Sequence, residues 1–114
     1  MREPTEPNCG LGPALRVIGG KWKATIIWEL HARPRRFGAL RRAVPGISEK
    51  ILTEQLRELE ADGVVRREVR SGKVLHVEYS LTEPGLRLNA AVHALAEWGT
   101  AHAMPRAAPA AAAG

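Results

Sequence analysis

The feature that most constrains the fold is a pair of short amphipathic segments, residues 35–43 and 48–62, separated by Pro45-Gly46. Each segment has apolar side chains on one face only, first Phe37 and Leu40, then Leu52, Leu56 and Leu59. Both segments are too short and too charged to form helices buried on all sides. The pattern is typical of a helix-turn-helix, whose second helix keeps a polar face free for duplex DNA. It indicates binding rather than catalysis.

Three further helices are predicted around this pair. Residues 13–18 predict a brief helix with proline at its start, and residues 21–32 predict a second one. Thr82 is suited to cap a last helix over residues 83–102. The apolar stripe of that helix consists of Leu88, Val92, Leu95 and Trp98.

After the second segment of the pair, the spacing of apolar residues changes from a helical period of about 3.6 to a strand period of about 2. Ser48 is a good N-cap for that segment, and Gly63 ends it. Residues 64–69 and 74–81 then alternate as β-strands, joined through a basic, glycine-containing loop. A hairpin directly after the recognition helix predicts an α+β fold, a mostly helical winged helix-turn-helix with a two-stranded wing. The fold would include additional helices at its N- and C-terminal ends.

Positive charge is concentrated in the segments expected to form the DNA-binding side. The chain has 17 Lys+Arg against 12 Asp+Glu, a formal net charge of +5. Eight basic residues and one acid lie in residues 13–43, whereas residues 83–114 hold two of each sign. This asymmetry suits a polyanion bound on one side, and a solvated basic surface is the alternative for the charge alone.

The chain is long enough for one domain, which we expect over residues 9–103. Residues 1–8 predict a flexible arm, and residues 104–114 predict a disordered Ala/Pro tail. No apolar run approaches the roughly 20 residues that span a bilayer, and no secretory signal is apparent, so we expect a cytoplasmic protein. The single cysteine excludes an internal disulfide and fits a reducing compartment.

Several runs, in the right order, resemble the HxlR-type winged helix-turn-helix regulators. The resemblance covers roughly residues 9–100. Its elements are an "IGGKW"-like run at residues 17–23, Arg35-Arg36-Phe37 leading to Leu40-Arg41-Arg42, a "PGIS-K-LT-QLRELEADG"-like run at residues 45–63, and "VEYSLT" at residues 77–82.

The resemblance implies a dimeric bacterial transcription regulator that joins through its terminal helices. Members often act as repressors, and some respond to quinones, aldehydes or oxidants through a cysteine near the N-terminus. Here that cysteine is Cys9, whose alternative role is a small buried apolar residue. As a sensor, its thiolate would lie near Arg16 or Lys21 and would react with an electrophile or oxidant.

The expected DNA contacts fall into three groups. On the second helix of the pair, base or phosphate contacts are expected from Ser48, Lys50, Thr53, Glu54, Gln55 and Arg57, with a solvated face as the alternative. Phosphate contacts around the first helix are expected from Arg35, Arg36, Arg41 and Arg42, some of which could instead pair with Glu58, Glu60 or Asp62. The wing tip is expected at Arg70, Ser71 and Lys73, with an ordinary exposed loop as the alternative.

The expected dimer interface consists of Leu11, Leu15, Leu88, Val92, Leu95 and Trp98. His93 and Glu97 have helical spacing but lack a suitable third ligand, so we expect a surface pair rather than a metal site. No nucleophile–base constellation is apparent, and we expect neither an enzyme nor a cofactor. Two alternatives stay open: regulation by a small ligand at the dimer interface, and a winged helix that binds another protein.

Overall fold

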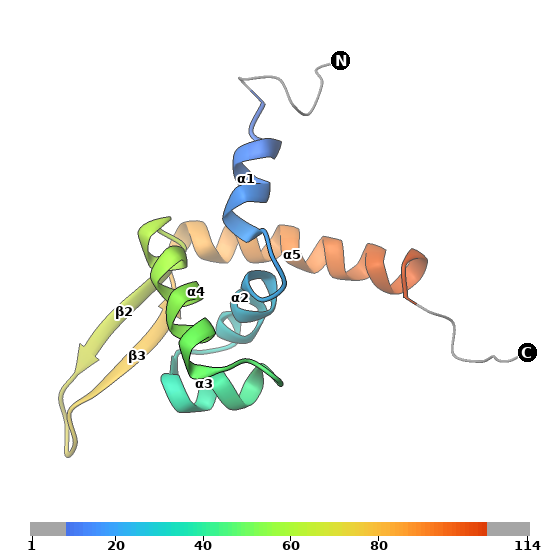
Figure 1. The fold of residues 1–114 in the computed structure, drawn as a ribbon. Coiled ribbons are helices and arrows are strands. Elements are labelled where there is room, and N and C mark those ends of the chain that lie inside the picture. The colour runs from blue at the N-terminus through green and yellow to red at the C-terminus, as the bar shows by residue number, and fades with distance from the viewer. Residues whose placement is uncertain (1–8, 105–114) are drawn as a thin grey trace, which may run out of the picture.

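The computed structural model describes residues 9–104 (Figure 1). The predicted arm at residues 1–8 and the tail from residue 105 onward lie outside the described residues. The elements follow in the order α1 (Leu11–Ile18), α2 (Lys23–His31), β1 (Arg35–Arg36), α3 (Phe37–Ala43), α4 (Glu49–Ala61), β2 (Val65–Arg70), β3 (His76–Leu81) and α5 (Glu83–His102).

The joint between α1 and α2 depends on two glycines. A side chain at Gly19 would lie 2.9 Å from the carbonyl oxygen of Leu15, and Gly20 has a φ of +90°. Neither position accepts another residue without strain. The α1 helix begins two residues earlier than predicted, so Pro13 occupies its first turn rather than its start; proline is tolerated there.

The predicted helix-turn-helix is confirmed as α3 and α4. Ser48 caps α4 as expected, because its Oγ accepts a hydrogen bond from the amide of Ile51 at 3.1 Å. Gly46 in the turn and Gly63 after α4 have φ values of +88° and +77°, which glycine adopts most easily. These two glycines therefore fix where α4 begins and ends.

The predicted wing is confirmed as an antiparallel hairpin of β2 and β3, which projects from the helices (Figure 1). Its register runs from Val65 opposite Leu81 to Arg70 opposite His76. A third strand, β1, was not predicted; it pairs with the other edge of β3, so the sheet order is β1-β3-β2. At two residues, β1 is too short to show a period in the sequence.

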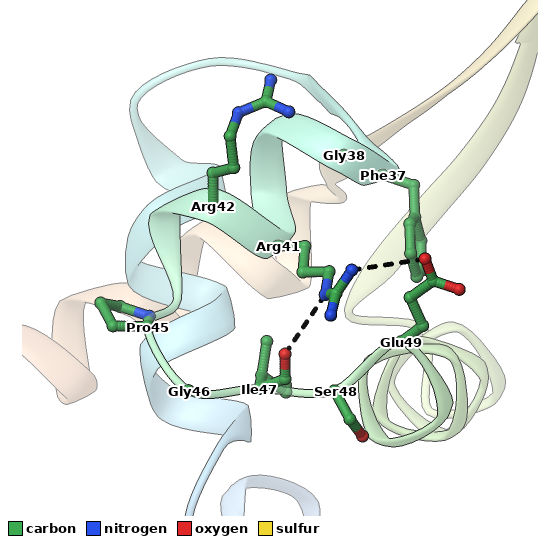
Figure 2. A pocket seen from close by; sticks show the side chains of 9 residues that line it. All are labelled: Phe37, Gly38, Arg41, Arg42, Pro45, Gly46, Ile47, Ser48 and Glu49. Atoms are coloured by element: carbon green, nitrogen blue, oxygen red, sulfur yellow. Dashed lines mark hydrogen bonds and ion pairs between the residues drawn. The ribbon is translucent and has the colours of Figure 1, made fainter.

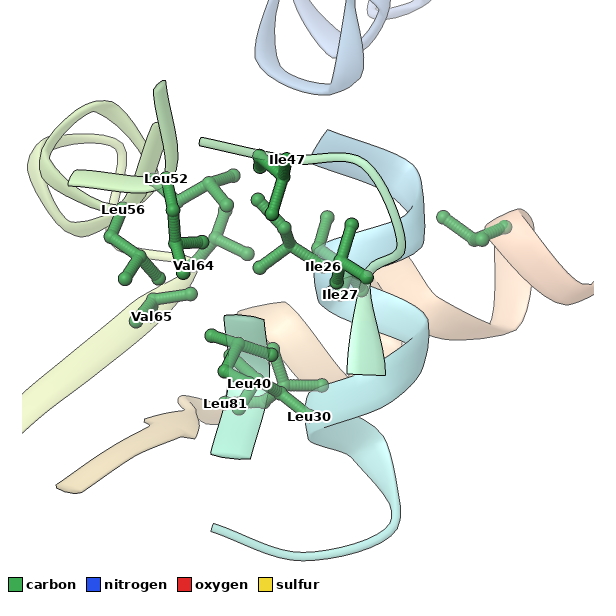
Figure 3. Packing of buried hydrophobic residues seen from close by; sticks show 13 residues of the cluster. Ile26, Ile27, Leu30, Leu40, Ile47, Leu52, Leu56, Val64, Val65 and Leu81 are labelled. Carbon is green, nitrogen blue, oxygen red and sulfur yellow. The ribbon is translucent and has the colours of Figure 1, made fainter. Parts of the chain in front are cut away.

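The hydrophobic core lies where α2, α3, α4 and the sheet meet (Figure 3). The three leucines predicted to face inward from α4 are all buried, as are Ile26, Ile27 and Leu30 of α2. Closely packed aliphatic side chains from all of these elements, with Val92 of α5, hold the helix pair against α2. The recognition helix is thus fixed through one face only.

The last helix packs on the core with its first half and extends beyond it with its second half (Figure 1). Thr82 caps it as predicted, accepting a hydrogen bond from the amide of Gly85 at 3.1 Å. The architecture is a winged helix-turn-helix with an additional helix at each end, as expected. None of the helices within residues 9–104 combines the length and apolar character needed to cross a membrane.

Candidate nucleic-acid interface

The outward face of α4 carries the polar residues that the sequence predicted. Lys50, Glu54 and Arg57 are exposed, and each lies opposite the buried leucine stripe. Thr53 and Gln55 are half-buried at the margins of this face. Among the described residues, Glu54 makes no ion pair with Lys50, so its carboxylate remains free to accept a hydrogen bond from a base.

An open pocket of about 630 Å³ lies at the turn between α3 and α4 (Figure 2). It is lined by residues of both helices and of the turn, namely Phe37, Gly38, Arg41, Arg42 and residues 45–49. The amino end of α4 opens here, where backbone N–H groups and the helix dipole favour an anion. The pocket therefore has the chemistry of a phosphate contact.

The two arginines at the end of α3 differ in their surroundings. Arg41 donates to the carbonyl oxygen of Ile47 at 3.4 Å and to the carboxylate of Glu49 at 3.3 Å. Arg42 points away from both (Figure 2), is exposed, and has no acid within ion-pair distance among residues 9–104. Arg42 is therefore the freer of the two to reach a DNA phosphate.

The prediction for Arg35 needs correction. Its guanidinium is half-buried and donates to the backbone oxygen of Glu29 at 3.0 Å and to the Glu29 carboxylate at 3.4 Å. These bonds hold β1 against the end of α2 and remove Arg35 from the outer surface. The next residue, Arg36, is exposed, because consecutive strand residues point in opposite directions.

Arg70 also differs from the prediction, because it belongs to the body of the wing rather than its tip. Glu68 and Glu78 face each other across the hairpin, where like charges repel. Arg70 lies 3.1 Å from the Glu68 carboxylate and 3.5 Å from that of Glu78, and so neutralises both. The loop beyond it exposes Ser71 and Lys73, which leaves Lys73 as the tip cation.

Sequence reasoning did not single out four charged side chains, namely Lys23, Glu49, Arg66 and Arg67. Glu49 pairs with Arg41, and Lys23 pairs with Glu58 rather than leaving that acid to an arginine of α3. Arg66 and Arg67 are exposed on β2 without an ion pair among the described residues. The local excess of basic residues from 66 to 73 was the only sequence signal for these two arginines.

The predicted dimer residues divide between the surface and the interior. Leu11, Leu15, Leu95 and Trp98 are 45%, 52%, 55% and 61% exposed, which is unusual for large apolar side chains on two neighbouring helices. Val92, in contrast, is buried in the core, and Leu88 is half-buried against it. These last two support α5 from within and are not available as surface contacts.

Cys9 lies two residues before α1, is half-buried and is a free thiol. Lys21 follows the opposite end of α1, and its amino group lies over the Trp22 ring, 4.8 Å from the ring centre, so the structure does not place it beside Cys9 as expected. Any change in the bonding of the Cys9 sulfur would act directly on the start of α1. No pairing of Cys9 with Arg16 is found among residues 9–104.

A second, largely apolar pocket of about 390 Å³ lies between α2 and α5 and is lined by Ala24, Thr25, Trp28, Val92, Leu95 and Ala96. At its side, the His93 ring stacks on Trp28 with 5.3 Å between ring centres. His93 lies 3.5 Å from Glu97, as expected for a surface pair. Within the described part of the chain, no third acid, histidine or cysteine joins them.

Comparisons with known proteins agree with this geometry. The chain matches the HxlR-like helix-turn-helix family over residues 17–107. The HTH-type transcriptional regulator YybR of Bacillus subtilis is 46% identical over 96 residues, which cover 84% of this chain and 77% of that protein.

Two solved structures are similar along most of the chain. The redox regulator HypR in its reduced form has a TM-score of 0.74 and 46% identity, covering 80% of this chain and 90% of that chain. The reduced form of the transcriptional regulator YodB from B. subtilis has a TM-score of 0.78 and 32% identity, covering 93% and 99%.

Proposed function

The chain belongs to the HxlR-like helix-turn-helix family of transcriptional regulators, and from this we propose that it represses transcription as a homodimer on a roughly palindromic operator. The observation that carries the proposal is the one-sided anchoring of α4. Its leucines are buried while Lys50, Glu54 and Arg57 are exposed on the opposite face. A recognition helix held in this way can enter the major groove without rearrangement.

The proposed contacts follow from the exposure of each group. Lys50, Glu54 and Arg57 read base edges or adjacent phosphates, Ser48 binds a phosphate at the turn, and Arg42 binds a separate phosphate beside α3. Lys73 and Ser71 reach the adjacent minor groove or its rim. Arg36 contacts a phosphate of the DNA backbone. Arg41 contacts a second phosphate, which replaces Glu49 as its partner.

The dimer is supported by the exposed apolar residues of α1 and α5. Two copies joined through these helices would present two α4 helices to the same side of a duplex. Half-sites are then expected about 34–36 Å apart, one turn of DNA. Chromosomal DNA as the partner implies a cytoplasmic protein, and we propose no catalytic activity for it.

Selection from a random pool of duplexes, followed by gel shifts at several salt concentrations, tests this function. We expect a palindromic sequence to be enriched and bound at least 10³-fold more tightly than unrelated DNA. Equal affinity for all duplexes would contradict the proposal. It would favour instead a winged helix that binds another protein with its basic face solvated.

We propose Cys9 as the sensor of the regulator, an idea supported by its place before α1 and by the similarity to the redox regulator HypR. Because each chain has one cysteine, oxidation would join two Cys9 thiols from different protomers. The two thiols would lose two protons and two electrons to the oxidant, for example diamide, which becomes the hydrazine.

The pocket between α2 and α5 favours a second candidate signal, a small apolar ligand. Replacing Cys9 by Ser separates the two. If operator release by diamide or methylglyoxal is lost in Cys9→Ser, the thiol is the sensor. Unchanged release would contradict the thiol mechanism.

A further inference from the structure

Lys23 is the one charged side chain among the described residues that is buried, with a relative exposure of 7%. It is the first residue of α2, whose first turn contains no acid. A cation at a helix N-terminus opposes the helix dipole, and a buried ammonium loses its hydration. A lysine at this position does not stabilise α2 and does not improve the packing. We therefore look for its role in the group that its ammonium binds.

That partner is on the recognition helix. The Nζ of Lys23 donates to Oε1 of Glu58 at 2.5 Å, across 35 residues of sequence. The side chain of Glu58 is 57% exposed, whereas that of Lys23 is 9% exposed. The ammonium thus reaches out of the interior to hold a carboxylate at the edge of α4.

The position of Glu58 around α4 determines what this bond does. Adjacent helical residues are about 100° apart, so Glu58 lies on a shoulder of α4, beside the contact face that Arg57 shares with Lys50 and Glu54. The buried leucines anchor α4 along one stripe, and the Lys23–Glu58 bond adds a directional contact on a second side of the helix. A rotation of about 20° would move groups some 6 Å from the axis by roughly 2 Å, which breaks a hydrogen bond to a base.

The neighbouring residue supports the other end of the helix. A Cβ on Gly46, in the turn before α4, would lie 3.8 Å from Cη2 of Trp22, so the indole packs against that turn. Trp22 and Lys23 follow directly on the Gly19-Gly20 joint with α1. The start of α2 is therefore the shortest connection between α1 and the recognition helix.

We propose that Lys23 is a positioning residue for operator recognition: through Glu58 it sets the rotation of α4 about its own axis, while Trp22 holds the turn before it. The inference rests on the proposed operator binding. It assigns to a half-buried ion pair the register role that buried polar groups have in some other proteins. In this arrangement, a displacement of α1 reaches the base-reading face through two adjacent side chains.

The test uses the full chain, a duplex selected by the wild type, and an unrelated duplex of the same length. Lys23→Met removes the ammonium and leaves Glu58 hydrated at the surface. We expect affinity for the selected duplex to fall about tenfold, the loss of one well-placed base contact, while affinity for unrelated DNA changes less than about twofold. Repeating the selection with the variant should give a changed or looser preferred sequence.

Arg87→Met is the matched control, since it removes one positive charge and one ion pair, with Glu83, on α5 rather than on α2 or α4. We expect it to leave both affinities and the preferred sequence unchanged. If Lys23→Met does not fold, Glu58→Met removes the acceptor of the same bond from the exposed side and should change the preferred sequence in the same way.

Two results would overturn the inference. A purely structural role would lower both affinities by the same factor, because less protein is folded, and would leave the preferred sequence intact. Wild-type affinity and wild-type sequence preference in Lys23→Met would also overturn the inference. If the wild type itself selects no sequence, the proposed function fails, and this inference fails with it.

Discussion

At the scale of single residues, the arginines of this chain divide into two sets that composition does not distinguish. Arg35, Arg41 and Arg70 donate to acids or carbonyls of the protein itself, whereas Arg36, Arg42 and Arg57 make no ion pair within residues 9–104. An arginine already paired in the free protein gains less from a phosphate. In the proposed complex, the second set is therefore expected to make the phosphate contacts.

The comparison of Arg42→Ala with Arg35→Ala tests this division. Each phosphate contact contributes about 0.9 to the slope of log affinity against log salt, so Arg42→Ala should reduce that slope by about one contact. Arg35→Ala should leave the slope unchanged and lower the free energy of unfolding by about 1–2 kcal/mol, because it removes hydrogen bonds to Glu29. Salt-dependent gel shifts and denaturant unfolding measure both; an equal slope change in the two variants would contradict the division.

Gly85 is another residue whose role is visible only in three dimensions. A Cβ there would overlap the carbonyl oxygen of Val64, which is backbone and cannot move aside, whereas nothing lies within 4 Å of a Cβ on Gly99 of the same helix. We expect Gly85→Ala to lower the free energy of unfolding by about 2–3 kcal/mol. Gly99→Ala should raise it by up to about 1 kcal/mol through helix propensity. Thermal or urea unfolding would show that the two substitutions change the free energy of unfolding in opposite directions. A Gly85→Ala variant as stable as the wild type would contradict the close contact between Gly85 and Val64.

At the scale of elements, the ends of the two long helices are held by caps of unequal importance. The Ser48 hydroxyl makes one bond, to the amide of Ile51. The Thr82 hydroxyl accepts from the amide of Gly85 and donates its single hydrogen to the carbonyl oxygen of Gly63 at 2.5 Å, with the carbonyl oxygen of Val64 also within reach at 3.1 Å. Thr82 therefore joins the end of α4, the start of β2 and the start of α5.

From these contacts we expect Ser48→Ala to cost about 1 kcal/mol of unfolding free energy. Thr82→Val keeps the shape of the side chain and should cost about 2 kcal/mol, because a cap and a donor are lost together. Denaturant titrations of both variants provide the measurement. A smaller loss in Thr82→Val than in Ser48→Ala would show that the shared hydroxyl is not central to this junction.

Elements with local signatures could be predicted from the sequence, and those that depend on distant partners could not. The leucine stripe, Ser48, Gly63 and Thr82 are local features, and the helices and wing they predict were confirmed. β1 has two residues and exists only because β3 offers a free edge. The pairs Lys23–Glu58 and Arg35–Glu29 depend on how the chain folds back, so no spacing rule reveals them.

At the scale of the whole molecule, α1 and α5 expose large apolar side chains although the described domain already has a core of its own. Exposed leucines occur singly on many proteins, but Leu95 and Trp98 share α5 with a pocket on one side, and α1 adds Leu11 and Leu15. None of these residues is needed by the core of the described domain. The proposed second copy would cover all four of them.

Leu95→Glu and Leu75→Glu provide a matched test of that explanation, since both leucines are exposed, at 55% and 70%, but Leu75 is on the wing. A buried charge at a dimer contact should weaken self-association by about 2 kcal/mol or more, roughly 30-fold, whereas the same change on the wing should leave it intact. Sedimentation velocity over a concentration series measures this directly. The loss should extend to DNA, because two linked recognition helices bind paired half-sites 10²–10⁴-fold more tightly than either alone. If Leu95→Glu remained dimeric and bound the palindrome like the wild type, the two copies would have to join through another surface, and the half-site spacing expected from α1 and α5 would lose its basis.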